Sequence, residues 1–334
     1  MKKLTRTDVE QLITSVIELN FEGADLSNLD LSNLDLSGAN FEGADLSIAD
    51  LSNSKLKFTN LENANLSKAN LYCAELEGAI LQEANLENAN LPYANLYKAN
   101  LYEANLLEAN LKNANLTSAN LYCAELENAN LENANLSKAN LEYAKITGAN
   151  LKNANLSKAN LECAYLENAN LEWAVLNFAN LQEAHLQEAN LEKANLVGAN
   201  MAFAELASCN LNGVNFKEAN LYQTSLMNAY ICGANFYKAK LKEAFLNGAK
   251  LKGAFFEGSN MKEINLENAN LKKANFESAN LKNAYLGGAE LQNVNMKNVN
   301  LKGTRFTTLD FEGINLDGTN LDEVIYIKEE ELLV

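Results

Sequence analysis

A period of five residues runs without an insertion from Phe21 to Leu321, and it constrains the fold more than any other feature. Counting in fives between these two residues gives 61 positions, and every one of them is Leu, Phe, Met or Ile. The residue two places before each is usually Ala, and the residue one place before is usually Asn or Asp. Neither an α-helix nor a flat strand keeps positions with this spacing on one side, because their periods are about 3.6 and 2. The chain must therefore turn regularly.

A chain that makes a quarter turn every five residues can bury all of these positions. Four such units close a coil of twenty residues, with the central residue and the Ala inside and the other three positions outside. Coils stacked at the strand spacing of about 4.8 Å would form a rod of about 15 coils, roughly 70 Å long. Because each unit touches its neighbours, the 334 residues should form one quasi-linear domain.

Units such as ANLEN, ANLSK and ADLSN, which continue through residues 19–323, resemble the A(D/N)LXX consensus of pentapeptide-repeat proteins. The resemblance implies an all-β fold, a right-handed quadrilateral parallel β-helix (a solenoid); the period alone does not supply the handedness. We expect a helical cap at 1–18, the β-helix at 19–323, and a tail at 324–334 that caps the last coil or dimerises. In the first segment, Thr7 and Glu10 fit a capping box before a short helix over residues 7–18.

The repeat also assigns roles inside each unit. Phe21, Leu26 and Leu66 are predicted core residues, and the corner Asn side chains should hydrogen-bond to nearby backbone or to the next coil. Gly at the last position of a unit should relax the turn. Four phenylalanines fall in one column when the sequence is aligned in twenties, and we predict that they stack in the core. These residues are Phe216, Phe236, Phe256 and Phe276.

The outward positions are less uniform than the core. One column begins with Glu22, Glu42 and Glu62 and ends with four lysines: Lys242, Lys262, Lys282 and Lys302. These lysines are either solubilising charges offset by nearby acids, or a basic strip that docks an acidic partner or the acidic half of another copy. Outward aromatic residues indicate a contact patch, since Tyr and Trp are enriched at interfaces. The residues singled out for this patch are Tyr102, Tyr122 and Trp173.

No catalytic, cofactor-binding or metal-binding constellation is recognisable. The single His, His185, falls at an outward corner, and the acids are spread along the surface. The five cysteines include no CxxC pair and are typical of reduced thiols in a cytosolic protein. Acidic residues interrupt the N-terminal apolar residues, and no apolar run approaches the roughly 20 residues of a membrane span. We expect a cytoplasmic protein without a membrane segment.

The net charge of −16 argues against direct binding of nucleic acid or an anionic membrane. The first functional hypothesis is therefore a non-enzymatic structural or protein-interaction rod with an unidentified partner, as a monomer or as a dimer through a chain end. The alternative follows from the resemblance: some pentapeptide-repeat proteins mimic DNA, bind DNA gyrase and protect it from quinolones or peptide toxins. Unlike several of those, this sequence has no loop interrupting the repeats. Its charge is also sparser than that of DNA, which carries about one charge per 1.7 Å.

Overall fold

The computed structural model describes residues 4–15, 18–307 and 313–327. The chain divides into two compact units, unit 1 (residues 1–170) and unit 2 (residues 171–334), and each is described by itself. Part of the expected C-terminal tail, residues 328–334, lies outside the described residues, as do Val16 and Ile17 of the expected N-terminal helix.

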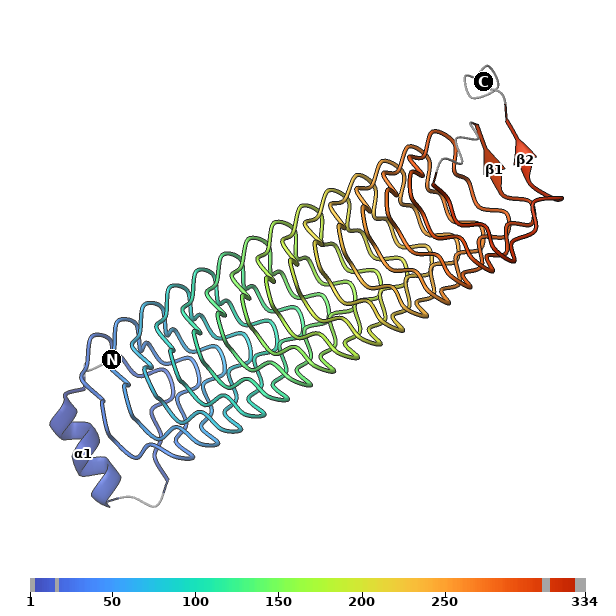
Figure 1. The fold of residues 1–334 in the computed structure, drawn as a ribbon. Helices are drawn as coiled ribbons and strands as arrows, with labels where there is room; N and C mark the ends of the chain where they lie inside the picture. The colour runs from blue at the N-terminus through green and yellow to red at the C-terminus, as the bar shows by residue number, and fades with distance from the viewer. Residues whose placement is uncertain (1–3, 16–17, 308–312, 328–334) are drawn as a thin grey trace. The chain divides into compact units, whose positions relative to one another are not determined.

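Unit 1 begins with helix α1, Arg6–Ser15 (Figure 1). Its N-cap is Thr5: the backbone N–H of Asp8 donates to Thr5 Oγ1 (3.2 Å), and the Thr5 N–H donates to Asp8 Oδ2 (2.8 Å). The predicted capping box of Thr7 and Glu10 is therefore wrong. Two overlapping Thr-x-x-acid patterns occur here, and Glu10 is engaged instead by Arg6, whose Nε lies 2.7 Å from its carboxylate.

Contacts from α1 reach the first coil of unit 1. The Arg6 guanidinium lies 2.7 Å from the Asp30 carboxylate and donates to the backbone oxygens of Asp30 and Ser32. Val9 is fully buried, and Leu12 is half-buried. One face of the helix thus packs on the chain that follows it.

Parallel β-bridges join residues twenty apart throughout both units. In unit 1 they run from Asn20↔Asn40 to Asn150↔Asn170, and in unit 2 from Val175↔Asn195 to Asn295↔Asn315. Only single residues pair at most corners, because the rest of each five-residue unit is used by the turn. The named strands are short and parallel: β1, Arg305–Phe306, pairs with β2, Ile325–Tyr326, in unit 2 (Figure 1).

The coil interior is filled by the Leu and Ala positions. Phe21, Leu26 and Leu66 are at most 2% exposed, and Phe21 stacks on Phe41 with ring centroids 4.9 Å apart. In unit 2 the four phenylalanines of one column are fully buried and stack at centroid distances of 5.0, 4.7 and 4.8 Å. These residues are Phe216, Phe236, Phe256 and Phe276.

The described turns from Gly23 to Gly318 use a positive φ at the second residue after the core residue. In the unit around Leu61, the Ala64 N–H donates to the Leu61 oxygen (3.1 Å) and Asn63 has φ of 56°. A β-turn with positive φ only at its third residue is of type II, which favours Gly or Asn there. Gly23, Gly43 and Gly248 occupy this position as predicted, with φ of 61°, 61° and 70°.

Corner asparagines bond both along and between coils. The Asn65 Oδ1 accepts the backbone N–H of Ser67 (3.1 Å), while its Nδ2 donates to Asp45 on the previous coil (3.0 Å). Repetition of these bonds holds successive coils in register.

Candidate interaction surface

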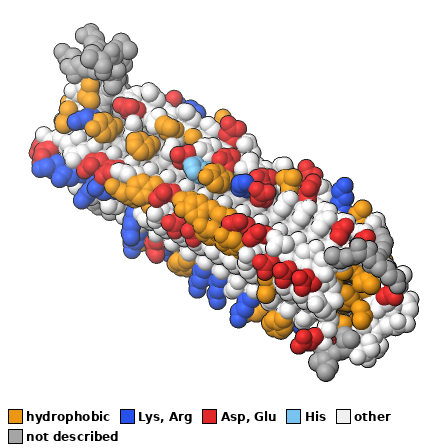
Figure 2. Space-filling view, turned by 180° about the vertical axis from the view of Figure 1, so that it is seen from behind, with side chains coloured by type: hydrophobic (Ala, Val, Ile, Leu, Met, Phe, Trp, Pro, Cys, Tyr) orange, Lys and Arg blue, Asp and Glu red, His pale blue; other side chains and the backbone are white. Residues whose placement is uncertain are grey.

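Large apolar side chains are exposed at several turn positions with positive φ. Bulky residues rarely adopt this conformation, and it costs most for a β-branched residue such as Ile48. Phe58 is 68% exposed and Phe178 is 61% exposed, so burial does not compensate for this cost. The set with positive φ comprises Ile48, Phe58, Tyr93, Tyr143, Trp173, Phe178 and Phe203. Figure 2 shows hydrophobic side chains gathered among acidic ones on one face.

Three tyrosines form a continuous row of ring contacts in unit 1. Tyr102 and Tyr122 stack with centroids 5.5 Å apart, and Tyr122 meets the edge of Tyr143 at 5.7 Å. The Tyr102 hydroxyl bonds to the Glu103 carboxylate, which raises the pKa of Tyr102 to about 12. Tyr102 and Tyr122 are half-buried, while Tyr143 is exposed. The structure thus brings two of the three aromatic residues singled out from the sequence into direct contact.

The third, Trp173, lies in unit 2 and is half exposed. The Lys193 ammonium sits 4.8 Å from the centroid of its ring, a favourable cation–π distance. Phe178 lies over Gly198: a Cβ added to that glycine would come within 2.6 Å of the Phe178 ring. Phe58 and Gly78 repeat this arrangement in unit 1, so glycine there allows the ring to lie close to the backbone.

The four column lysines differ in their partners. Lys242 pairs with Glu243 and Lys302 with Glu323, both at 2.7 Å. The pKa of the Glu243 carboxyl is lowered mainly by its hydrogen bond with Lys242, and to a smaller extent by its hydrogen bond with Gln223. Among the described residues, Lys262 and Lys282 form no ion pair. Nearby acids therefore offset half of this column, and the other half remains available.

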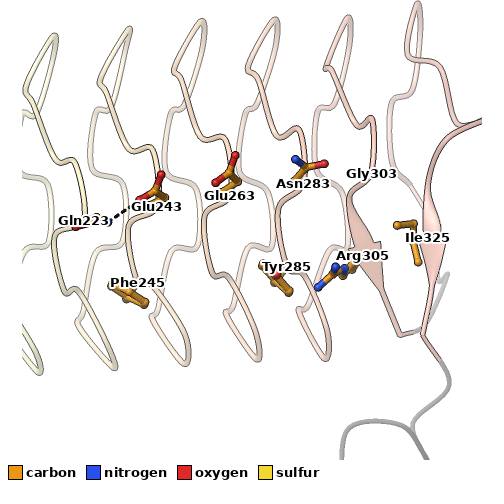
Figure 3. A pocket seen from close by; sticks show the side chains of 9 residues that line it. All are labelled: Gln223, Glu243, Phe245, Glu263, Asn283, Tyr285, Gly303, Arg305 and Ile325. Carbon is orange, nitrogen blue, oxygen red and sulfur yellow. Dashed lines mark hydrogen bonds between the residues drawn. The ribbon is translucent and has the colours of Figure 1, made fainter.

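A surface groove of about 530 Å³ runs across successive coils in unit 2 (Figure 3). Glu243 and Glu263 line one side, and Phe245 and Tyr285 line the other. Arg305 lies over the Tyr285 ring, 4.6 Å from its centroid. The sequence reading missed Phe245, Tyr285 and Arg305, although alignment of the corner positions in twenties places all three in one column.

The other sequence-derived candidates for chemistry are the single His and the five cysteines. His185 Nδ1 lies 3.4 Å from Glu205 on the next coil, in an exposed contact. None of the five cysteines forms a disulfide, and Cys209 occupies a buried Ala position, where desolvation raises the pKa of its thiol to about 12. Within the part of the chain that the structure describes, no group of His, Cys, Asp and Glu could hold a metal ion. None of the described helices is long and apolar enough to cross a membrane.

Comparison with protein families decides the class. The family described as pentapeptide repeats matches in eight copies, and a second description, pentapeptide repeat region, matches residues 199–276 and 234–306. The chain belongs to the pentapeptide-repeat family. The first set of matches spans residues 17–53, 44–82, 69–106, 79–117, 94–133, 134–172 and 174–213. The repeat and the β-helical solenoid predicted from the sequence are thereby confirmed.

Solved structures resemble this pentapeptide-repeat chain only in part. A trypsin-treated form of QnrB1, a plasmid-mediated fluoroquinolone resistance protein, is 17% identical, covering 60% of this chain and 88% of its own, with a TM-score of 0.42. HetL, involved in heterocyst differentiation regulation in the cyanobacterium Nostoc sp. strain PCC 7120, is 28% identical, covering 87% and 96%, with a TM-score of 0.19. Such low TM-scores support no transfer of function. Comparison with curated protein sequences found no significant match.

Proposed function

We propose that this pentapeptide-repeat protein is a non-enzymatic, cytoplasmic interaction scaffold whose partner is a protein. One observation carries the proposal: large apolar side chains stand exposed at turn positions where glycine or asparagine would be more stable. Trp173, Phe178 and Phe203 provide three such side chains in unit 2. Their cost to the fold is offset if they bury themselves in a partner, as aromatic residues at interface hot spots do.

A triple substitution tests this proposal. Trp173→Asn, Phe178→Asn and Phe203→Asn should leave the fold at least as stable, because Asn tolerates positive φ better than the aromatic residues do. Capture of specific proteins from an extract of the native host should fall. The matched control is Glu188→Asn, which changes another exposed turn residue with φ of 61° in the same unit.

The only tryptophan of the chain supplies a direct readout. Since Trp173 is half exposed, its fluorescence should change when a purified captured partner binds. Equal capture by the wild type and the triple variant, with no fluorescence change, would refute the proposed surface.

The DNA-mimic alternative is favoured by one observation, the charge of unit 1. Residues 1–170 carry 12 basic and 23 acidic residues, a net charge of −11. If unit 1 substitutes for DNA, it should inhibit gyrase supercoiling or protect the enzyme from a quinolone. A supercoiling assay with and without the drug decides this, and no effect in either condition removes the alternative.

We further propose that residues 1–18 cap the β-helix of residues 19–323, and that residues 324–334 cap its other end or dimerise. The contacts of Arg6 with Asp30 and Ser32 support the N-terminal cap. An uncovered coil would offer its backbone edge to other chains, and a helix placed over it prevents such stacking. Deletion of residues 1–15 should therefore promote aggregation, measured by light scattering.

A further inference from the structure

The lysine strip of unit 2, defined as Lys242, Lys262, Lys282 and Lys302, places like charges on successive coils. The stacked core rings of the same unit show that coils lie 4.7–5.0 Å apart. Like charges directly opposite one another on neighbouring strands repel. Lys242 and Lys302 have carboxylate partners, but Lys262 and Lys282 have none among the described residues. The strip would therefore be stabilised by a row of negative charges with the same spacing.

Unit 1 carries such a row, the glutamate strip of Glu22, Glu42 and Glu62. It occupies the same position within the coil as the lysine strip, directly after the core residue. The coil spacing is also the same, since the Phe21 and Phe41 rings lie 4.9 Å apart. Glu42 accepts a hydrogen bond from Asn60 (3.3 Å), and none of the three glutamates pairs with a Lys or Arg among the described residues.

We propose that the lysine strip docks on the glutamate strip of a second copy of this chain, with the two strips antiparallel. Each pair then has sequence numbers that add up to the same value. The three ion pairs formed in this register are Glu22 with Lys302, Glu42 with Lys282, and Glu62 with Lys262.

The antiparallel direction is favoured by the residues that follow in the same column. Continuing the register places Tyr102 of one copy opposite Tyr222 of the other, so that two partly buried rings meet. A parallel register would use the charges alone and leave these tyrosines beyond the end of the lysine strip.

Small residues beside the strips allow close approach. Gly23 and Gly43 follow the first two glutamates, and Gly303 follows the last lysine. Each copy carries both strips, so a second copy can supply the strip that either one needs. The ion pairs lie at the surface and are screened by salt, whose Debye length is about 10 Å at 0.1 M. The association should therefore be strong at low ionic strength and weak at high ionic strength.

Charge reversal gives the first test, with sedimentation velocity of the full chain as the measurement. At low salt the wild type should dimerise. Lys262→Glu with Lys282→Glu should be monomeric, and so should Glu42→Lys with Glu62→Lys. An equimolar mixture of the two variants should recover the dimer, because each reversed strip then meets its complement. A monomeric wild type, or a mixture that stays monomeric while both variants remain folded by circular dichroism, overturns the proposal.

The matched control reverses two lysines of unit 2 that lie at outward positions of other columns. Lys252→Glu with Lys273→Glu makes the same change in net charge and should leave the dimer intact. Loss of the dimer in this control would show that net charge alone governs association, and would also overturn the proposed strip.

Zero-length carbodiimide cross-linking tests the register. In a mixture of isotopically light and heavy copies, mixed-label cross-links should join Glu22 to Lys302 and Glu62 to Lys262. Cross-links of Glu22 to Lys242, or of Glu62 to Lys302, would contradict the antiparallel register.

This inference deepens the proposed function by naming a second copy as one partner. It uses none of Trp173, Phe178 and Phe203, so the two proposals fail independently. A monomer that still captures a host protein through those aromatic residues retains the proposed function and loses only the strip pairing.

Discussion

Replacement of Phe256 by Leu tests whether the stacked rings stabilise unit 2 beyond their size. Phe256 is fully buried and contacts two rings, Phe236 at 4.7 Å and Phe276 at 4.8 Å. Phe216 is equally buried but has one ring neighbour, Phe236 at 5.0 Å. Leu is a tolerated size in this column, because Leu196 occupies it without exposure. The two substitutions therefore differ mainly by one ring pair.

The expected difference follows from the value of that pair. A stacked aromatic pair contributes about 0.5–1.5 kcal/mol beyond the burial of its area. Phe256→Leu should thus reduce the free energy of unfolding by about 0.5–1.5 kcal/mol more than Phe216→Leu does. Phe236→Leu, which also removes two ring contacts, should match Phe256→Leu. Truncation of Phe256 to Ala should cost about 3–5 kcal/mol, because it leaves a cavity as well.

Urea denaturation monitored by circular dichroism provides the measurement. Repeat arrays can lose two-state behaviour, so the variants should be compared only where the slope of free energy against urea is unchanged. If Phe216→Leu and Phe256→Leu shift the midpoint equally at an equal slope, the ring pairs contribute nothing beyond side-chain size and the reasoning fails.

Three further substitutions probe other parts of the chain. Thr5→Ala should destabilise α1 by about 0.5–2 kcal/mol through loss of the N-cap, whereas Thr7→Ala should have little effect. Hydrogen exchange of the helix amides measures this, and equal exchange rates in the two variants would refute it. Glu103→Gln should lower the pKa of Tyr102 from about 12 towards the ordinary 10.0, seen in the tyrosinate absorbance. Because the folded-state pKa is raised, this interaction stabilises the fold below pH 10.0 and is lost as the pH rises through about 12. Cys209 should resist alkylation until the protein is unfolded, since burial raises its pKa to about 12, and rapid labelling of the native chain would contradict its burial.

The core could be predicted from the sequence because burial follows directly from the repeat. A coil interior accepts only the positions that recur every five residues. The burial of Leu26, Leu66 and the phenylalanine column could therefore be predicted from the repeat alone. Corner asparagines were equally predictable, since an Asn side chain reaches its own backbone two residues on. Asn65 does so, and it also bonds to the previous coil.

The N-cap of α1 could not be predicted in the same way, because two similar sequence patterns compete for it. Thr5 and Thr7 both precede an acid by three residues, and the choice was decided by Arg6, which binds Glu10 and also reaches Asp30. The positive φ shared by the described turns from Gly23 to Gly318 was also hidden, because only some of these turns contain Gly. Trp173 gives no local sign of a left-handed conformation, and it adopts one because hydrogen bonds to the neighbouring coil hold its backbone.

The spacing of the coils limits which partners can match the outward columns. Side chains of one column lie about 4.8 Å apart, whereas those on one face of an extended peptide lie about 6.6 Å apart, at twice the rise per residue. A charged peptide would fall out of step with Lys262 and its neighbours within a few coils. A second stack of parallel strands has the same spacing and stays in step for the whole length of the strip. The coil spacing brings the like charges of the lysine strip close together. The same spacing in a second copy provides a surface that can neutralise them.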